Sequence, residues 1–330
     1  MEKFRLAHLG EYERVVQIFE EAMEALHSQG IQQWNGGYPN RQLLREDIEK
    51  GEMWALEENG ELLAVVVLND SSDVDYDTSC FTAVERPLLV HRLCVVPDKQ
   101  GQGVGGRMMM HCEAWARMEG YEALRLEAYS ANGPALRLYD KLGYQDRFLL
   151  REPFGDFVLY EKVLGGRYLR KARLEELDGI LEMYQRGIQG MIGRGIDQWD
   201  DTYPNRAILE EDIRNKQLFV FVEDGILAAA ALNEEQDLEY QKLTWEYADP
   251  SLVIHRLLVD PDCQGQGVGR ALMASIEEYA RHQGYASIRL DTYIKNYLAL
   301  NLYDSMGYGR RGILKFPFHH GEFQAFEKVL

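Results

Sequence analysis

The chain of 330 residues contains one long internal repeat. The segment VHRLCVVPDKQGQGVG, which begins at Val90, returns 164 residues later as IHRLLVDPDCQGQGVG from Ile254. Asn132 and Asn296 keep the same offset. A chain of 330 residues suits two domains of ordinary size, and each copy is long enough to bury its own core. The chain is therefore expected to fold as two homologous domains.

A second pair of matching segments lies near the start of each copy. GIQQWNGGYPN begins at Gly30 and GIDQWDDTYPN begins at Gly195, an offset of 165 that implies a gap of one residue. Gly165 and Gly166 follow a strand-like FVLYEKVL and separate the copies. We place the domains at residues 1–164 and 165–330.

Hydrophobic spacing predicts the elements of each copy. Apolar residues recur at helical intervals over 12–26, and a second helix is expected between the N-cap Asn40 and Gly51. The pairs Asn59–Gly60 and Asp224–Gly225 are typical of hairpin turns. A strand over 90–96, a helix up to residue 120, a strand near 127, a short helix over 135–142 and closing strands follow. This order predicts an α+β fold with a mixed, mainly antiparallel twisted sheet flanked by helices.

Composition excludes several classes of protein. The apolar runs over 62–68 and 226–232 are one strand long, too short for a membrane span, and the start of the chain lacks a signal-peptide pattern, so we expect a cytoplasmic protein. The net charge of -18 argues against nucleic acid as a partner. Four cysteines without CxxC spacing give no basis for a metal site.

Both copies carry the sequence QGQGVG, at residues 100–105 and 264–269, between an expected strand and an expected helix. Glycines let the backbone approach a ligand closely, and a helix N-terminus offers unpaired amide hydrogens and a partial positive charge. The segment is therefore suited to binding a diphosphate.

A dinucleotide-binding loop is the main alternative. Gly101, Gly103 and Gly106 satisfy GxGxxG, and Glu127 follows about 20 residues later. However, Arg270 occupies the third glycine position in the second copy, and the loop does not open its domain. These differences argue against a Rossmann unit.

The glycine loops and the residues after them resemble the GCN5-related N-acetyltransferases. The shared pattern is an asparagine, an alanine three residues later, a tyrosine and a glycine-tyrosine pair. Its members are Asn132, Ala135, Tyr139, Gly143 and Tyr144, and again Asn296, Ala299, Tyr303, Gly307 and Tyr308. The resemblance covers nearly all of both copies. It implies two tandem acyl-CoA N-acyltransferase domains and an N-acetyltransferase that uses acetyl-CoA without a metal.

The resemblance also implies a cofactor site made of one strand, the glycine loop and the start of the short helix. In the first copy these residues are Leu93, Cys94, Val95, Gln100, Gly101, Gln102, Gly103, Val104, Gly105, Gly106, Asn132 and Ala135. In the second copy they are Leu257, Leu258, Val259, Gln264, Gly265, Gln266, Gly267, Val268, Gly269, Arg270, Asn296 and Ala299. We interpret Cys94 as a core residue, since leucine replaces it in the second copy.

The implied reaction is direct attack of a neutral amine on a thioester. Tyr139 and Tyr303 match the general acid of the family, since a phenol stays protonated at neutral pH and can donate a proton to the leaving thiolate. For the base, the candidates are His91 and His255 on one strand, and Glu127 and Asp291 on the next. The residue pattern leaves this choice open.

The acceptor pocket is expected from the repeated GIxQW segment. Its candidate lining residues are Trp34, Tyr38, Trp199 and Tyr203. An alternative interpretation of the segment is a packed loop in which Asn40 and Asn205 cap helices. For Asp200 and Asp201 we favour solvated side chains over contacts with a cationic amine.

Three hypotheses about function follow. The first is an enzyme that acetylates a primary amine of an unidentified small molecule or peptide. The second makes one half a non-catalytic scaffold; because the first loop carries the additional Gly106, the sequence favours the second half as the active one. The third is an acyl-CoA sensor without turnover. Two halves in one chain also suggest a monomer that acts as a pseudo-dimer.

Overall fold

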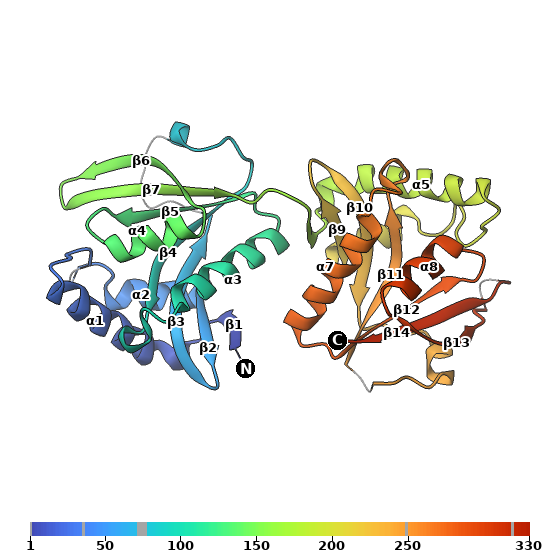
Figure 1. The fold of residues 1–330 in the computed structure, drawn as a ribbon, viewed down its shortest axis with the longest axis horizontal. Coiled ribbons are helices and arrows are strands. Elements are labelled where there is room, and N and C mark those ends of the chain that lie inside the picture. Colours follow the sequence, from blue (N-terminus) through green and yellow to red (C-terminus); the bar gives the residue numbers. More distant parts are fainter. Residues whose placement is uncertain (1, 35–36, 71–77, 248–249, 318–319) are drawn as a thin grey trace. The chain divides into compact units, whose positions relative to one another are not determined.

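The computed structural model describes residues 2–34, 37–70, 78–247, 250–317 and 320–330. The chain divides into two compact units, Met1–Gly165 and Gly166–Leu330, and each unit is described by itself (Figure 1).

The N-terminal unit follows the predicted order of elements. Its members are β1 (Glu2–Leu6), α1 (Tyr12–Ser28), α2 (Arg41–Glu49), β2 (Met53–Glu58), β3 (Glu61–Asn69), β4 (Pro87–Val95), α3 (Val104–Met118), β5 (Ala123–Tyr129), α4 (Gly133–Lys141), β6 (Gln145–Glu152) and β7 (Gly155–Val163). The Asn40 side chain caps α2 by accepting the amide hydrogen of Leu43 at 2.9 Å. Asn59 and Gly60 both have positive φ, as a two-residue hairpin turn between β2 and β3 requires.

The C-terminal unit repeats this order. Its members are β8 (Tyr168–Lys171), α5 (Leu177–Gly193), α6 (Arg206–Arg214), β9 (Leu218–Val222), β10 (Ile226–Asn233), β11 (Ser251–Val259), α7 (Val268–Gln283), β12 (Ser287–Tyr293), α8 (Tyr297–Ser305), β13 (Gly309–Leu314) and β14 (Phe323–Val329). Asn205 caps α6 in the same way that Asn40 caps α2.

Each unit contains one twisted seven-stranded sheet. The strand orders are β1-β2-β3-β4-β5-β7-β6 and β8-β9-β10-β11-β12-β14-β13. The pairs β4–β5 and β11–β12 are parallel, and the other pairs are antiparallel. The predicted α+β class with a mainly antiparallel sheet is confirmed.

Helices cover both faces of the N-terminal sheet (Figure 1). On one face, α1 and α2 pack on β2, β3 and β4 through a cluster that includes Phe19, Leu44 and Val65. On the other face, α3 and α4 pack on the central strands through a second cluster that includes Met108 and Tyr139. Within the described part of the chain, every helix is too short or too polar to cross a bilayer.

Candidate functional site

Strands β4 and β5 pair only along their first halves. Parallel pairing joins Pro87–Val90 to Ala123–Leu126. Beyond that point, among the described residues, β4 pairs with β3 and β5 pairs with β7. The strand edge at residues 93–95 therefore faces a gap. An extended ligand can pair with such an edge through backbone hydrogen bonds, and these residues are the ones that the resemblance assigns to the cofactor.

A β-bulge at Arg92 bends β4 at the start of this gap. The pairing of β3 with β4 shifts between Val65 and Val67, and Arg92 has a φ of 51°. A non-glycine residue in the left-handed region costs about 1 kcal/mol or more, so surrounding contacts must hold it there. A bulge bends its strand and increases the twist, which explains why β4 and β5 separate.

A buried ion pair holds Arg92 in this conformation. Its Nη2 donates to Asp47 Oδ1 at 2.9 Å, and its Nη1 donates to the Tyr38 hydroxyl at 3.0 Å. Burial raises the pKa of Asp47, although the Arg92 charge opposes this rise. The contacts join α2 and the repeated GIxQW segment to the bulge, so Arg92 places the predicted acceptor residue Tyr38.

The C-terminal unit contains the same arrangement. Arg256 has a φ of 51°, donates to Asp212 through Nε at 2.9 Å and Nη2 at 2.8 Å, and donates to Tyr203 at 3.1 Å. Sequence reasoning missed this arginine-aspartate pair. The signal was present, since the His-Arg dipeptide occurs in both copies and the aspartates keep the offset of 165.

The glycine loop has the backbone shape expected of an anion site. Gly101 and Gly103 have φ values of 74° and 79°, and Gly103 is the N-cap of α3. Gly105 faces Leu138 of α4, where an added Cβ would lie 3.2 Å from Cδ2. Gly265 and Gly267 repeat the positive φ in the second unit. The first amide groups of a helix lack intrahelical partners and are available to phosphate oxygens.

Several guanidinium groups lie near the glycine loops. Arg107 donates to the Gln102 carbonyl and Arg167 donates to the Gln266 carbonyl, each at 3.4 Å. In the N-terminal unit, Arg137 of α4 lines the cavity described below and has no ion pair or hydrogen bond with any described residue. In the C-terminal unit, Arg270 of α7 donates to Ser305 of α8 at 2.8 Å. Arg137 is therefore a free cation in an acidic protein, beside a predicted diphosphate site.

Asn132 links the start of α4 to the GIxQW segment. Its Oδ1 accepts the amide hydrogen of Ala135 at 3.2 Å, and its Nδ2 donates to Gln33 Oε1 at 2.7 Å. Asn296 makes the equivalent contacts with Ala299 and Gln198, at 3.3 and 2.9 Å. The glutamine of the repeated segment is thus another residue that sequence reasoning missed. Residues 35–36 of this segment lie outside the described residues.

The predicted acid tyrosines lie in α4 and α8 and are almost fully buried. Tyr139 contacts the rings of Tyr144 and Tyr160, with centroids 5.8 and 5.6 Å apart. Burial raises the pKa of Tyr139 and of Tyr303 well above the usual value of a phenol. Both hydroxyls are therefore protonated at neutral pH, as a proton donor must be.

The candidate base histidines, His91 and His255, both make hydrogen bonds with groups of the fold. His91 Nε2 lies 3.1 Å from Asn69 Oδ1. His255 Nε2 lies 2.9 Å from Asn233 Oδ1 and 3.1 Å from the Glu235 carbonyl. A carbonyl can only accept, so Nε2 of His255 carries the hydrogen. Burial lowers the pKa of His255 to about 4, and the ring is neutral at neutral pH.

The carboxylate candidates for the base lie on the matching strands β5 and β12. Glu127 is half-buried and lines the cavity of the N-terminal unit. Asp291 is half-buried and accepts a hydrogen bond from the Tyr240 hydroxyl at 2.7 Å. Burial raises the pKa of Asp291 to about 6, although this hydrogen bond opposes the rise. Of the candidates for the base, Glu127 lines the cavity, whereas His91 and His255 are held by acceptor groups, so the position of Glu127 fits proton removal better.

A cavity of about 880 Å³ in the N-terminal unit joins these features. Of the sequence-predicted site residues of the first copy, Gln102 is the one that does not line it, since its side chain donates to the Asp98 carbonyl at 2.7 Å. The predicted residues that line the cavity are Trp34, Tyr38, His91, Leu93, Cys94, Val95, Gln100, Gly101, Gly103, Val104, Gly105, Gly106, Asn132, Ala135 and Tyr139. The structure brings these residues together, and their individual roles stay predictions.

The equivalent surface of the C-terminal unit contains a packed apolar cluster. Leu314, Phe316 and Phe323 are buried against Ile188 and Met191 of α5. The rings of Phe316 and Phe323 make an edge contact with centroids 5.1 Å apart. These side chains are buried in one cluster, whereas the matching residues Leu150, Glu152 and Phe157 of the N-terminal unit line the cavity.

The predicted absence of a metal stays a prediction. In the part of the chain that the structure describes, no three histidine, cysteine, aspartate or glutamate side chains converge as metal ligands would.

Curated proteins with similar sequences are named as N-acetyltransferases. The uncharacterized N-acetyltransferase YesJ of Bacillus subtilis is 26% identical over 152 residues, which cover 45% of this chain and 84% of that protein. The mycothiol acetyltransferase of Rhodococcus opacus is 24% identical over 239 residues, 68% of this chain and 72% of that protein.

Two solved structures each cover about half of this chain. A GNAT-family acetyltransferase of Streptococcus agalactiae covers 50% of this chain and 96% of its own, with 25% identity and a TM-score of 0.45. YncA of Salmonella typhimurium, solved with acetyl-CoA, covers 50% of this chain and 95% of its own, with 19% identity and a TM-score of 0.40.

The family model of the acetyltransferase (GNAT) family matches twice, at residues 14–144 and 181–308, one match in each unit. Together the matches cover more than half of the chain. With the relatives named as N-acetyltransferases, they show that this chain belongs to the acetyltransferase (GNAT) family, as a tandem member with two copies of the domain.

Proposed function

We propose that the chain transfers an acetyl group from acetyl-CoA to a primary amine and that the N-terminal unit carries out the transfer. The observation that carries this proposal is the cavity of about 880 Å³, because it joins the glycine loop, the separated strand edge and the Tyr139 ring in one space. A ligand with a diphosphate at one end and a thioester at the other fits this order of features.

The residues present fit acetyl-CoA. The amide groups of residues 101–105 form a cradle for the diphosphate, and the unpaired Arg137 adds a cation that a phosphate group needs in a chain of net charge -18. The gap beside residues 93–95 is open to the pantetheine arm. When bound, acetyl-CoA supplies the activated acyl group.

In this proposal, Glu127 and Tyr139 each carry out one of the proton transfers. Glu127, directly or through water, takes a proton from the acceptor ammonium, and the neutral nitrogen attacks the thioester carbon. A C–N bond forms, the C–S bond breaks, and Tyr139 donates its proton to the departing sulfur. The attacking nitrogen then loses its second proton, which returns to the Tyr139 oxygen directly or through water. A backbone amide of residues 93–95 stabilises the oxygen charge that develops between these steps.

The C-terminal unit is proposed as a domain without turnover. Its glycine loop and Tyr303 repeat those of the first unit, but Phe316, Phe323 and Leu314 fill the place where an acceptor would bind. This interpretation reverses the preference for the second half that the single additional Gly106 suggested. A sensor without any turnover is a second alternative, which the same assay tests.

Thiol release from acetyl-CoA, measured with a panel of amines, tests the proposal. Tyr139→Phe is expected to lower kcat by about 100-fold or more, because general acid catalysis typically contributes that factor. Tyr303→Phe is the matched control in the other unit and should leave turnover near the wild-type rate. Loss of activity in Tyr303→Phe alone would assign catalysis to the C-terminal unit. Binding of acetyl-CoA without thiol release for every amine would support the sensor.

A further inference from the structure

Four side chains of the N-terminal unit form one strip along the acceptor part of the cavity. Glu127 of β5 is opposite Leu159 of β7, and Leu159 is opposite Phe148 of β6. Side chains alternate between the faces of a sheet, so residues two and four positions along β6 share the face of Glu127. These are Leu150 and Glu152, and both line the cavity, as does Phe157.

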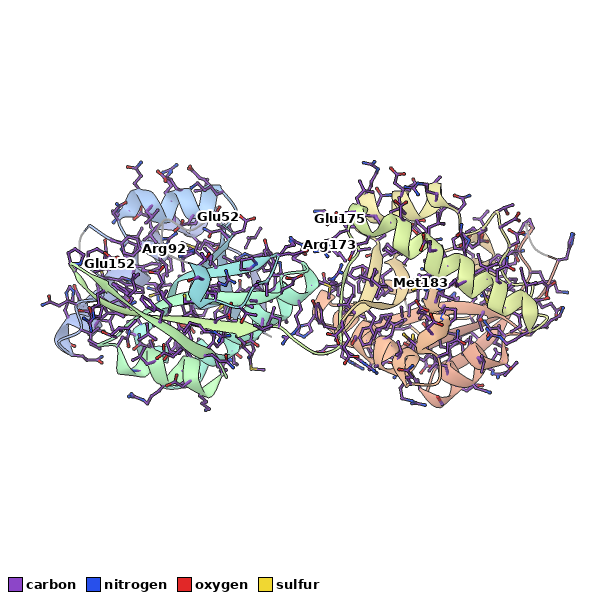
Figure 2. The ribbon with its side chains drawn as sticks, turned by 90° about the horizontal axis from the view of Figure 1, so that it is seen from above. Glu52, Arg92, Glu152, Arg173, Glu175 and Met183 are labelled. Carbon is purple, nitrogen blue, oxygen red and sulfur yellow. The ribbon has the colours of Figure 1, made fainter. Side chains whose placement is uncertain are left out.

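The two ends of the strip are carboxylates and its middle is apolar. Glu127 lies nearest the gap between β4 and β5, and Glu152 lies at the end of the β6–β7 hairpin (Figure 2). From four residues of strand rise and two strand spacings, the Cα atoms of Glu127 and Glu152 are about 16 Å apart. Phe157 and Leu150 lie between Glu127 and Glu152. The rings of Phe154 and Phe157 make an edge contact, with centroids 5.9 Å apart.

Glu152 is half-buried and unpaired. No hydrogen bond or ion pair joins its carboxylate to any described side chain. Two arginines also line the cavity. Arg92 is paired with Asp47, and the guanidinium of Arg137 lies beside Gly133 at the start of its own helix α4. A carboxylate left without a partner in a cavity favours a cationic ligand group there.

The repeat provides an internal comparison for this position. Leu150 is opposite Phe157 in the N-terminal unit, and Leu314 is opposite Phe323 in the C-terminal unit. Two residues further along, Glu152 corresponds to Phe316, which is buried in the apolar cluster. The fold therefore accepts an apolar residue at this place, and nothing in the sheet itself requires a carboxylate in the first unit.

Resting on the function proposed above, we infer that the acceptor of the N-terminal unit carries two cationic amines separated by an apolar chain. One nitrogen lies near Glu127 and receives the acetyl group. The second stays protonated and pairs with Glu152, while the chain between them lies against Phe157 and Leu150. An extended α,ω-diamine has this chemistry.

Kinetics with alkyl amines of matched length test the inference. The full chain is assayed by thiol release with α,ω-diamines from diaminopropane to diaminooctane and with n-alkylamines of the same carbon number. The ratio of kcat/KM for a diamine to that for its monoamine should rise with chain length and reach about tenfold at the best length, the size of one hydrogen bond to a charged group.

Two variants locate the effect. Glu152→Gln, which keeps the size of the side chain, and Glu152→Phe, which copies the other unit, should each bring the ratio close to one. Asp156→Asn removes a nearby charge on the opposite face of β7 and should keep the wild-type ratio.

The inference and the proposed function fail in different ways. A wild-type ratio near one at every length, a ratio that survives Glu152→Gln, or a ratio that Asp156→Asn removes equally would overturn the inference while acetylation itself remains. No thiol release with any amine would overturn the proposed function and this inference with it.

Discussion

Replacement of Gly187 by alanine tests how α5 packs on β11 in the C-terminal unit. Gly187 lies in the middle of α5, and a Cβ added there would lie 2.6 and 2.7 Å from the two methyl carbons of Leu258. In the N-terminal unit, Ala22 and Cys94 occupy the matching positions. Thus Ala22 of the helix matches Cys94 of the strand in the N-terminal unit, whereas the smaller Gly187 matches the larger Leu258 in the C-terminal unit.

The expected size follows from two opposing effects. Overpacking a buried site costs about 1–3 kcal/mol, and Leu258 has little space to move because it is buried in a cluster. Alanine in place of glycine inside a helix stabilises it by about 1 kcal/mol. Gly190 in the same helix has no atom within 4 Å of an added Cβ, so Gly190→Ala shows the helix effect alone.

Differential scanning calorimetry of the full chain measures both variants. For a domain of this size, 1 kcal/mol shifts Tm by about 2–4 °C, so Gly190→Ala should raise one of the two unfolding transitions by about that amount. In the same transition, the Tm of the Gly187→Ala variant should be lower than that of the Gly190→Ala variant by about 2 °C or more. In the Leu258→Cys background, which copies the first unit, Gly187→Ala should become as stabilising as Gly190→Ala.

A Gly187→Ala variant with the same Tm as Gly190→Ala would refute the close packing. The close packing would also be refuted if Gly187→Ala lowered Tm relative to Gly190→Ala by the same amount in the Leu258→Cys background as in the wild type, since the two changes would then act independently.

Three further predictions concern charged groups. The pKa of Asp291 is raised to about 6, so protonation of this side chain favours the folded state. Its contribution to the free energy of unfolding is full below about pH 4 and is lost as pH rises through 6, a loss of up to about 3 kcal/mol. In urea unfolding, Asp291→Asn should flatten this part of the pH profile of stability. Asp47→Ala should destabilise the N-terminal unit by about 3–5 kcal/mol in the same assay, since Arg92 is left charged and buried, and a loss below 1 kcal/mol would contradict the buried pair. Arg137→Gln should raise KM for acetyl-CoA about tenfold with little change in kcat, measured by thiol release; an unchanged KM would remove Arg137 from the phosphate site.

The sequence was sufficient to predict the order of elements and the fold. Local signals were strong at the Asn40 cap and at the Asn59–Gly60 turn, and the structure has both. The family match confirms the resemblance that the glycine loops and the downstream Asn132 pattern indicated.

Several features of the candidate site were not predictable from local patterns. The bulge at Arg92 depends on an ion pair with Asp47, 45 residues away in the chain, and no local preference predicts positive φ for an arginine. The contact between Gln33 and Asn132 is also long-range. The difference between Glu152 and Phe316 becomes informative only in the folded chain, where Glu152 lines the cavity and Phe316 is buried in the apolar cluster.

A crystal structure of the chain with acetyl-CoA would show directly whether the N-terminal cavity binds this cofactor. We expect a diphosphate against the amide groups of residues 101–105 and a thioester between the edge of β4 and the Tyr139 hydroxyl. An empty cavity in the N-terminal unit at saturating acetyl-CoA, or a thioester far from Tyr139, would contradict this expectation.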